Sequence, residues 1–145
     1  MTRKFFCIAV IGLLTAAATT DEKGIEIEKL KGSWACISAT VNGKALSDET
    51  VKKLRLTLSE TGYKTQKGDD ALFDSTYTID ITQQPKWIDI IGTEGEAKGK
   101  AARGIYALEN GKLRICYTMP GGKRPTAFES APDSGASLAV WQRAP

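Results

Sequence analysis

The chain has 145 residues, of which 41% are hydrophobic and 26% are charged, and its formal net charge is +3, so it suits one globular domain. Disordered, collagen-like and coiled-coil chains have different compositions. The sequence contains no histidine. This excludes a His general base, Ser–His and Cys–His nucleophile pairs, and the commonest zinc ligand.

The first 18 residues have the pattern of a secretory signal peptide. Arg3 and Lys4 precede an apolar run over 5–14, and the small residues of 15–18 provide an A-x-A-type cleavage site. The apolar run is too short to cross a hydrocarbon layer about 30 Å thick, which argues against a permanent anchor. We therefore expect cleavage near Ala18 and export to the periplasm, the cell envelope or the medium.

The charge of the mature chain gives no indication of a nucleic-acid or lipid partner. Removal of residues 1–18 takes away Arg3 and Lys4 but no acidic residue, so the formal net charge falls from +3 to +1. The remaining charges are interspersed, and no block of like charges is present to bind phosphate backbones or anionic lipid. We expect no nucleic-acid partner and no transmembrane segment in the mature form.

After a polar lead over 19–27, the chain divides into short segments with period-2 patterning, separated by Gly, Asn, Asp and Pro. One short helix is expected after the first strand, because Ser47 can cap a helix that starts between Leu46 and Val51. Pro85 marks the start of a strand. The pattern predicts eight or nine strands, which include 33–41, 54–58, 63–66, 72–82, 87–91, a hairpin over 103–118, 125–129 and 138–141.

The hairpin over 103–118 has the most specific local prediction. Asn110-Gly111 is a preferred pair for a two-residue type I′ turn, so it fixes which residues of the two strands face each other. The expected cross-strand pairs are Leu108 with Leu113, Tyr106 with Ile115, and Glu109 with Lys112.

With no long helix to cover a sheet, the sequential strands must bury their apolar faces against each other. The strands follow one another as hairpins, and this order favours closure of the sheet into a barrel. Closure also removes exposed edge strands. The sequence thus predicts an all-β fold, a small antiparallel up-and-down barrel over 28–143. An eight-stranded barrel is either filled by side chains or holds one small ligand.

Several segments carry a resemblance to a known family. Gly32-Ser33-Trp34 is similar to the Gly-x-Trp start of lipocalins, and the further segments are Val41-Asn42-Gly43-Lys44-Ala45-Leu46, Lys86-Trp87-Ile88-Asp89-Ile90, Gly104-Ile105-Tyr106, Leu113-Arg114-Ile115-Cys116 and Arg124-Pro125-Thr126-Ala127-Phe128. Together they resemble the uncharacterised lipocalin-like domain abundant in planctomycete bacteria. The resemblance covers roughly residues 28–143 and implies a calycin-like barrel, commonly exported, with no established ligand or reaction. Cys36 stands where that family usually has an aliphatic residue.

Aromatic side chains are the candidates for lining a ligand pocket, since such pockets are mainly hydrophobic. The alternative is that the same rings fill the core. Trp34, in its lipocalin-like setting, is expected to plug one barrel end with the guanidinium of Arg143 or Arg124 over its ring. The ligand-lining candidates are Trp34, Tyr77, Trp87, Tyr106 and Tyr117, and Trp141 is a further aromatic of the same kind.

Cys36 and Cys116 are the cysteines that remain after cleavage, and an oxidising compartment would allow a disulfide between them. The expected strand faces favour two separate thiols, because Cys36 shares the inward face of Trp34 whereas Cys116 shares the face of Arg114. A disulfide needs Cα atoms within about 7 Å and converging Cβ atoms. Both possibilities stay open on sequence alone.

The acidic residues do not form a recognisable catalytic or metal motif. Turn and surface positions account for Asp69-Asp70, Asp80, Asp89 and Glu94 with Glu96. The glycine-rich segment 95–104 is expected to be a loop at the barrel mouth. We expect no catalytic residue, no metal site and no cofactor, and hence a non-enzymatic domain that binds a small hydrophobic ligand or an envelope partner. The alternatives are a filled structural or protein-interaction barrel and, third, an enzyme built on carboxylates.

Overall fold

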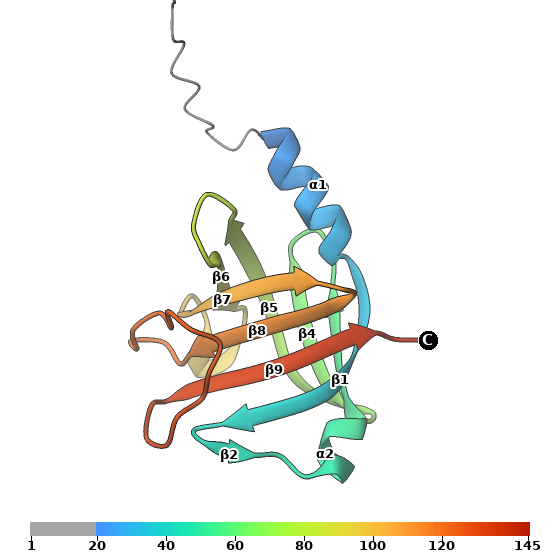
Figure 1. Ribbon diagram of the computed structural model, residues 1–145, viewed down its shortest axis with the longest axis vertical. Coiled ribbons are helices and arrows are strands. Elements are labelled where there is room, and N and C mark those ends of the chain that lie inside the picture. Colours follow the sequence, from blue (N-terminus) through green and yellow to red (C-terminus); the bar gives the residue numbers. More distant parts are fainter. Residues whose placement is uncertain (1–19) are drawn as a thin grey trace, which may run out of the picture.

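The computed structural model describes residues 20–145, and these residues form a closed antiparallel β-barrel (Figure 1). Consecutive strands pair with each other from β3 to β9, and β1 pairs with both β3 and β9 to close the barrel, while β2 extends one edge of β1. The predicted fold class is confirmed. The elements are α1 (Thr20–Leu30), β1 (Gly32–Val41), β2 (Lys44–Ala45), α2 (Asp48–Lys53), β3 (Leu54–Leu58), β4 (Gly62–Lys67), β5 (Asp70–Asp80), β6 (Lys86–Gly92), the 3-10 turn η1 (Gly95–Ala97), β7 (Ala101–Glu109), β8 (Lys112–Thr118) and β9 (Ala136–Arg143).

Local sequence rules place the helix and the tightest hairpin correctly. Ser47 caps α2, and its side chain accepts a hydrogen bond from the backbone N–H of Thr50. Asn110 and Gly111 both have positive φ, at 53° and 73°, as a type I′ turn requires. The three predicted cross-strand pairs of the β7–β8 hairpin are all present.

The expected strand over 125–129 is wrong. β8 pairs directly with β9, so the barrel has no place for another strand between them. The connection 119–135 instead runs without regular structure and supplies Phe128 to a small apolar cluster with Ile105, Cys116 and Ala136. This cluster is separate from the main core, so the connection covers part of the barrel's outer face.

Helix α1 occupies most of the segment expected to be a polar lead. Its Glu26 and Leu30 are buried and Ile27 is partly buried, so one narrow stripe of the helix faces the barrel. The carboxylate of Glu26 accepts a hydrogen bond of 3.0 Å from the hydroxyl of Tyr106 and lies 2.9 Å from the ammonium of Lys86. Leu30 accepts a hydrogen bond from the indole N–H of Trp34. Two hydrogen bonds and one ion pair thus hold the helix on one end of the barrel.

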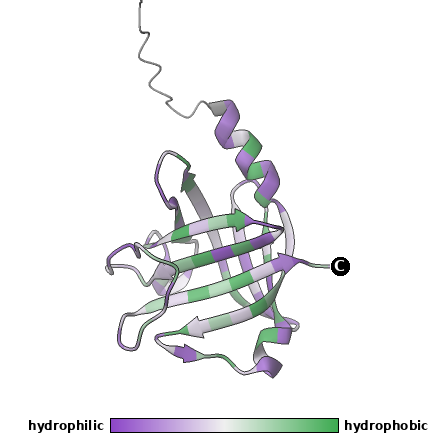
Figure 2. Cartoon of the chain, in the orientation of Figure 1, coloured by the Kyte–Doolittle hydropathy of each residue, from purple (hydrophilic) through white to green (hydrophobic). Residues whose placement is uncertain are grey.

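Period-2 alternation places the core inside the barrel, and hydrophobic and hydrophilic residues alternate along the strands in Figure 2. Along β1 the alternation changes at a bulge. Trp34 and Cys36 are buried, the register shifts between Cys36 and Ser38, and Ala39 is then buried in turn. The extra residue, Ile37, is exposed.

The two ends of the barrel differ. At the end where β1 begins and β9 ends, α1 lies against the barrel (Figure 1), and the guanidinium of Arg143 lies 4.0 Å from the centroid of the Trp34 ring. This is the plug expected for Trp34, with Arg143 rather than Arg124 as the cation. We call this the closed end. The opposite end, where β1 ends and β9 begins, contains a cavity.

Candidate functional site

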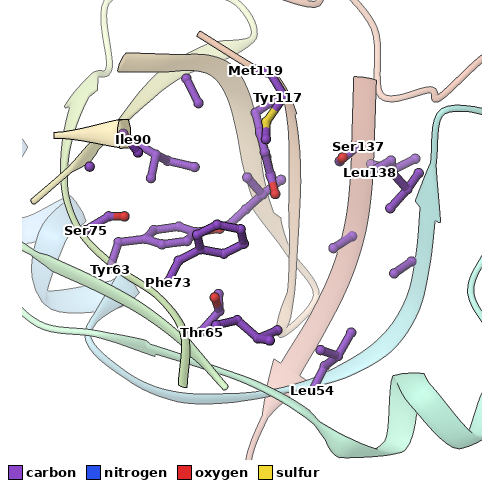
Figure 3. A pocket seen from close by; sticks show the side chains of 18 of the residues that line it. Leu54, Tyr63, Thr65, Phe73, Ser75, Ile90, Tyr117, Met119, Ser137 and Leu138 are labelled. Atoms are coloured by element: carbon purple, nitrogen blue, oxygen red, sulfur yellow. The ribbon is translucent and has the colours of Figure 1, made fainter. Parts of the chain in front are cut away.

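An apolar cavity of about 240 Å³ opens at the end opposite α1, and we call it the barrel cavity (Figure 3). Every barrel strand and the connections at that end contribute to its wall. Most of the lining side chains are aliphatic or aromatic, and the hydroxyl-bearing ones are few. The lining residues are Ala39, Thr40, Val41, Leu46, Leu54, Tyr63, Thr65, Leu72, Phe73, Ser75, Ile90, Gly92, Ala97, Lys100, Ala102, Ile115, Tyr117, Met119, Pro120, Ser137, Leu138, Ala139 and Trp141.

Small side chains leave the space. Ala39, Ala102 and Ala139 line the cavity from β1, β7 and β9, where larger aliphatic residues would extend into it. Ala39 and Ala102 are buried in the same core cluster as the large residues of the closed end. The barrel is thus filled by bulky side chains towards Trp34 and hollow towards the mouth.

Three aromatic rings form much of the wall. Tyr63 and Phe73 point into the cavity from β4 and β5, and Tyr117 faces it from β8 (Figure 3). Burial raises the pKa of the Tyr63 hydroxyl well above its usual value, and burial also raises the pKa of Tyr117 although a hydrogen bond with Ser137 partly offsets this. Both phenols are therefore neutral at physiological pH, and the wall they form carries no charge.

The rim of the cavity is apolar and exposed. Leu72, Phe73 and Met119 are 44%, 55% and 58% exposed, although each is a large hydrophobic residue. The segment after β6 lies at the same rim through Ala97 and Lys100, so the glycine-rich segment is at the mouth as predicted. Gly92 permits this approach, because a Cβ atom there would lie 2.2 Å from the carbonyl oxygen of Ala97.

Two polar atoms of cavity-lining residues lack a partner. Among residues 20–145, the buried side-chain atoms without a hydrogen bond are Thr65 Oγ1, Trp141 Nε1 and Asp89 Oδ1. Asp89 Oδ1 lies 2.7 Å from Nη1 of Arg124 and is therefore ion-paired. The other two belong to side chains that line the cavity. Both atoms are themselves enclosed by protein and are not exposed to the cavity space.

Of the five ligand-lining candidates, Tyr117 alone lines the barrel cavity. Trp34, Tyr77 and Tyr106 are buried in the main core instead. Their polar atoms are already used: Trp34 donates to Leu30 O, Tyr77 donates to Ser59 O and Tyr106 donates to Glu26. These three candidates are wrong as cavity residues, and the alternative reading as core filler holds for them.

Trp87 is wrong for a different reason, because it lies on the outer face of the barrel. Its neighbours Ile88 and Ile90 are buried, whereas Trp87 is 37% exposed. The guanidinium of Arg124 lies 4.1 Å from the centroid of its ring and pairs with Asp89. Trp87 therefore borders a groove of about 610 Å³ on the outer face, whose lining is more polar than that of the cavity.

The cavity residues that sequence reasoning missed include Tyr63, Thr65 and Phe73. All three lie in segments that were predicted as strands, 63–66 and 72–82, but none was singled out as a lining residue. The pairing of β4 with β5, which sets Tyr63 beside Ser75 and Thr65 beside Phe73, brings them into one wall, and no local pattern contains that pairing. Trp141, which sequence reasoning weighed only as a further aromatic, does line the cavity.

Cys36 and Cys116 are free thiols. Cys36 lies opposite Trp141 of β9, whereas Cys116 lies opposite Leu138. Trp141 and Leu138 are three positions apart on one strand, so the two thiols point to opposite faces of the sheet. Burial raises the pKa of Cys36 to about 11, and it also raises the pKa of Cys116. Neither is an activated nucleophile.

The acidic residues are dispersed. No group of three or more His, Cys, Asp or Glu side chains in residues 20–145 is placed to hold a metal ion. The one buried carboxylate among the described residues is that of Glu26, which is bound by Lys86 and Tyr106 at the closed end. It lies away from the cavity mouth and has a structural role.

Comparison with protein-family models, curated proteins and solved structures finds no match to this chain. No helix within residues 20–145 is both long and apolar enough to cross a membrane. The expected signal peptide over 1–18 lies outside the described residues.

Proposed function

We propose that this chain is an exported, non-catalytic β-barrel domain that binds a small hydrophobic ligand in the barrel cavity. The observation that carries the proposal is a largely apolar cavity of about 240 Å³ inside the barrel, with an exposed apolar rim. Its volume is slightly below the range of roughly 300–1,000 Å³ usual for drug-sized ligands, so a smaller molecule is favoured. Export to the periplasm, envelope or medium stays a prediction from residues 1–18, and lipocalin-like family membership stays a prediction from the resemblance over residues 28–143.

The charge distribution supports a neutral ligand. Lys100 is the one charged residue among those lining the cavity in the described part of the chain, and it is exposed at the rim. The wall deeper in the barrel is formed by aliphatic residues and by the neutral rings of Tyr63 and Tyr117. A buried charge would have no counter-ion there and would lose its hydration without compensation.

The competing hypothesis is a structural or protein-interaction domain without a ligand. It is favoured by the same exposed rim, because Leu72, Phe73 and Met119 could contact an envelope partner. The two hypotheses differ in what fills the cavity. A ligand-binding domain takes up a small apolar molecule at a single saturable site, whereas an interaction domain does not.

The test is a titration of the ¹⁵N-labelled mature protein with toluene, an uncharged apolar probe, followed by NMR. We expect saturable shifts concentrated on residues that line the cavity, such as Ala39, Ala102 and Ala139, and little change at Trp87. A folded protein without saturable shifts would overturn the proposal and favour the interaction domain.

Two substitutions on one strand provide a matched pair. Ala102 is buried and lines the cavity from β7, whereas Ala107 is on the opposite face of the same strand and pairs with Arg114. Ala102→Phe fills the cavity and should abolish toluene binding. Ala107→Phe adds the same side chain outside the barrel and should leave the binding unchanged.

A further inference from the structure

The exposed hydrophobic side chains of the barrel gather around the cavity mouth. Residues 20–145 expose seven large hydrophobic side chains, and four of these line the barrel cavity. The other three, Ile25, Ile37 and Trp87, are not part of its lining. Single exposed hydrophobic residues are ordinary, whereas a cluster of them marks an interaction surface. We call the four residues Val41, Leu72, Phe73 and Met119 the mouth patch.

A bulge in β5 brings two members of the mouth patch to the same place. Thr65 pairs with Phe73, and Gln66 pairs with Ala71, so Leu72 is an extra residue between the two pairs. In a regular strand, adjacent side chains point to opposite faces, and only one of Leu72 and Phe73 would reach the mouth. With the bulge, both line the cavity and both are exposed. The irregular register therefore enlarges the apolar surface at the mouth.

The size of the mouth patch favours a lipid surface over a second protein chain. A stable interface between two proteins takes about 20–30 residues from each side. The mouth patch has four side chains, each between 44% and 58% exposed. A fluid lipid surface needs no complementary shape, and its binding strength grows with whatever apolar area is buried in it. A partner chain seated on the patch would also cover the opening of the cavity, whereas a bilayer there supplies apolar molecules to it.

The charges beside the mouth patch indicate contact without a preference for anionic lipid. Lys44 is the cross-strand neighbour of Val41, and Lys100 lines the mouth, and both are exposed. Their long stems allow the ammonium groups to stay in water while the apolar side chains enter the hydrocarbon. Glu94 and Glu96, in the segment that leads to Lys100, are exposed as well. Charges of both signs thus surround the patch, and a zwitterionic surface suits them.

We propose that the mouth patch docks the barrel onto the surface of a lipid bilayer, with the cavity mouth facing the bilayer. Helix α1, at the opposite end of the barrel, then points away from the lipid (Figure 1). An apolar ligand passes between the bilayer and the cavity without crossing water. The transfer of a ligand rests on the proposed function, whereas the docking does not.

The first experiment measures partitioning of the mature protein onto vesicles of phosphatidylcholine by co-sedimentation. Phe73→Ser and Met119→Ser should each lower the partition coefficient by roughly 5- to 15-fold, as expected for a half-exposed hydrophobic side chain that loses its burial in lipid. Ile25→Ser is the matched control, because Ile25 is 59% exposed against 55% for Phe73 but lies on α1. It should leave the partition coefficient unchanged. Added salt, or phosphatidylglycerol in the vesicles, should change it little.

The second experiment locates the contact without any variant. The ¹⁵N-labelled mature protein is mixed with phosphatidylcholine bicelles that contain a spin-labelled lipid, and the broadening of each amide signal is recorded. Signals of Leu72 and Met119 should broaden most, and those of α1 least. Equal broadening at both ends of the barrel, or stronger broadening at α1, would overturn the proposed orientation and with it the proposal.

The remaining outcomes separate this inference from the proposed function. A folded protein that does not partition onto phosphatidylcholine, or that binds only anionic vesicles at low salt, would overturn the docking proposal, and toluene binding without vesicles would leave the proposed function standing. A dimer in vesicle-free buffer that Phe73→Ser dissociates would assign the mouth patch to a second copy and overturn the docking proposal too. Partitioning that depends on the mouth patch, with no toluene binding, would support docking and overturn ligand transfer.

Discussion

The guanidinium of Arg143 lies over the indole ring of Trp34, 4.0 Å from its centroid, and donates hydrogen bonds to the carbonyl oxygens of Lys29 and Lys31. One side chain from the last strand therefore joins the end of α1 to the start of β1. Because Trp34 also donates to Leu30 O, the closed end is fixed by contacts among residues far apart in the sequence. The barrel cavity opens at the opposite end.

Arg143→Ala should destabilise the fold by about 1–2 kcal/mol, because it removes the cation–π contact and two hydrogen bonds to carbonyl oxygens. The change should appear as a lower midpoint of urea unfolding with an unchanged m value. Gln142→Ala, an exposed neighbour on the same strand, is the control and should change the midpoint little. Equal effects of the two substitutions would contradict this role for Arg143.

Glu26→Ala should cost roughly 2–3 kcal/mol of unfolding free energy, because Tyr106 and Lys86 would lose the buried carboxylate that accepts from both. Glu28, on the same helix, forms an exposed ion pair with Lys31. Glu28→Ala should therefore cost less than about 1 kcal/mol. Chemical denaturation of the two variants side by side measures the difference, and similar values would show that α1 is not held by its buried acid.

Local rules were enough for part of the fold. Asn110-Gly111 determines the register of β7 and β8 through its own backbone conformation, and Ser47 caps α2 by accepting a hydrogen bond from the backbone N–H of Thr50. Both effects act within a few residues, so the sequence reveals them directly. Helix α1 was missed because its buried stripe consists of Glu26, Ile27 and Leu30, too few apolar residues to produce a visible helical period.

The cavity depends on relations that no local pattern contains. Trp87 was assigned inward although Ile88 and Ile90 also favour the inward face, and alternation alone cannot choose between two apolar faces. Whether the barrel is hollow depends on the summed volume of side chains from all strands. Ala102 and Ala139 are individually compatible with a filled core, and their contribution to the cavity follows from what faces them across the barrel.

Stability should decrease as the pH rises from about 9 to about 11. Burial raises the pKa of Cys36 to about 11 from an ordinary value of 9.0, so in this interval the unfolded chain releases a proton that the folded chain retains. Below the interval both states are protonated, and above it both are ionised, so the contribution of Cys36 changes only within it. Urea midpoints measured across this range should fall less steeply for Cys36→Ala than for the unaltered chain.

The urea midpoint of Cys36→Ala should still fall with rising pH, although less steeply. The reason is that burial also raises the pKa of Cys116 and of several tyrosines, among them Tyr77 and Tyr117. If the urea midpoints of Cys36→Ala and of the unaltered chain fell equally between pH 9 and 11, the Cys36 thiol would ionise as readily in the folded chain as in the unfolded one. Slow alkylation of Cys36 by iodoacetamide at pH 8 is an independent check, since the thiolate is the reactive form.

Gly104→Ala and Gly24→Ala should change stability in opposite directions. A Cβ atom at Gly104 would lie 2.6 Å from the carbonyl oxygen of Cys116 and 2.9 Å from Cβ of Tyr117, so β7 and β8 would have to separate at a cost of about 1–3 kcal/mol. A Cβ atom at Gly24 of α1 would meet nothing within 4 Å, and alanine there should stabilise the helix by about 0.5–1 kcal/mol. Thermal unfolding of the two variants tests both signs.

The same two variants should differ in toluene binding. Because Tyr117 lines the cavity, Gly104→Ala should weaken the binding, whereas Gly24→Ala should not. A folded Gly104→Ala variant with unchanged affinity for toluene would show that the close contact between β7 and β8 does not position the ring of Tyr117.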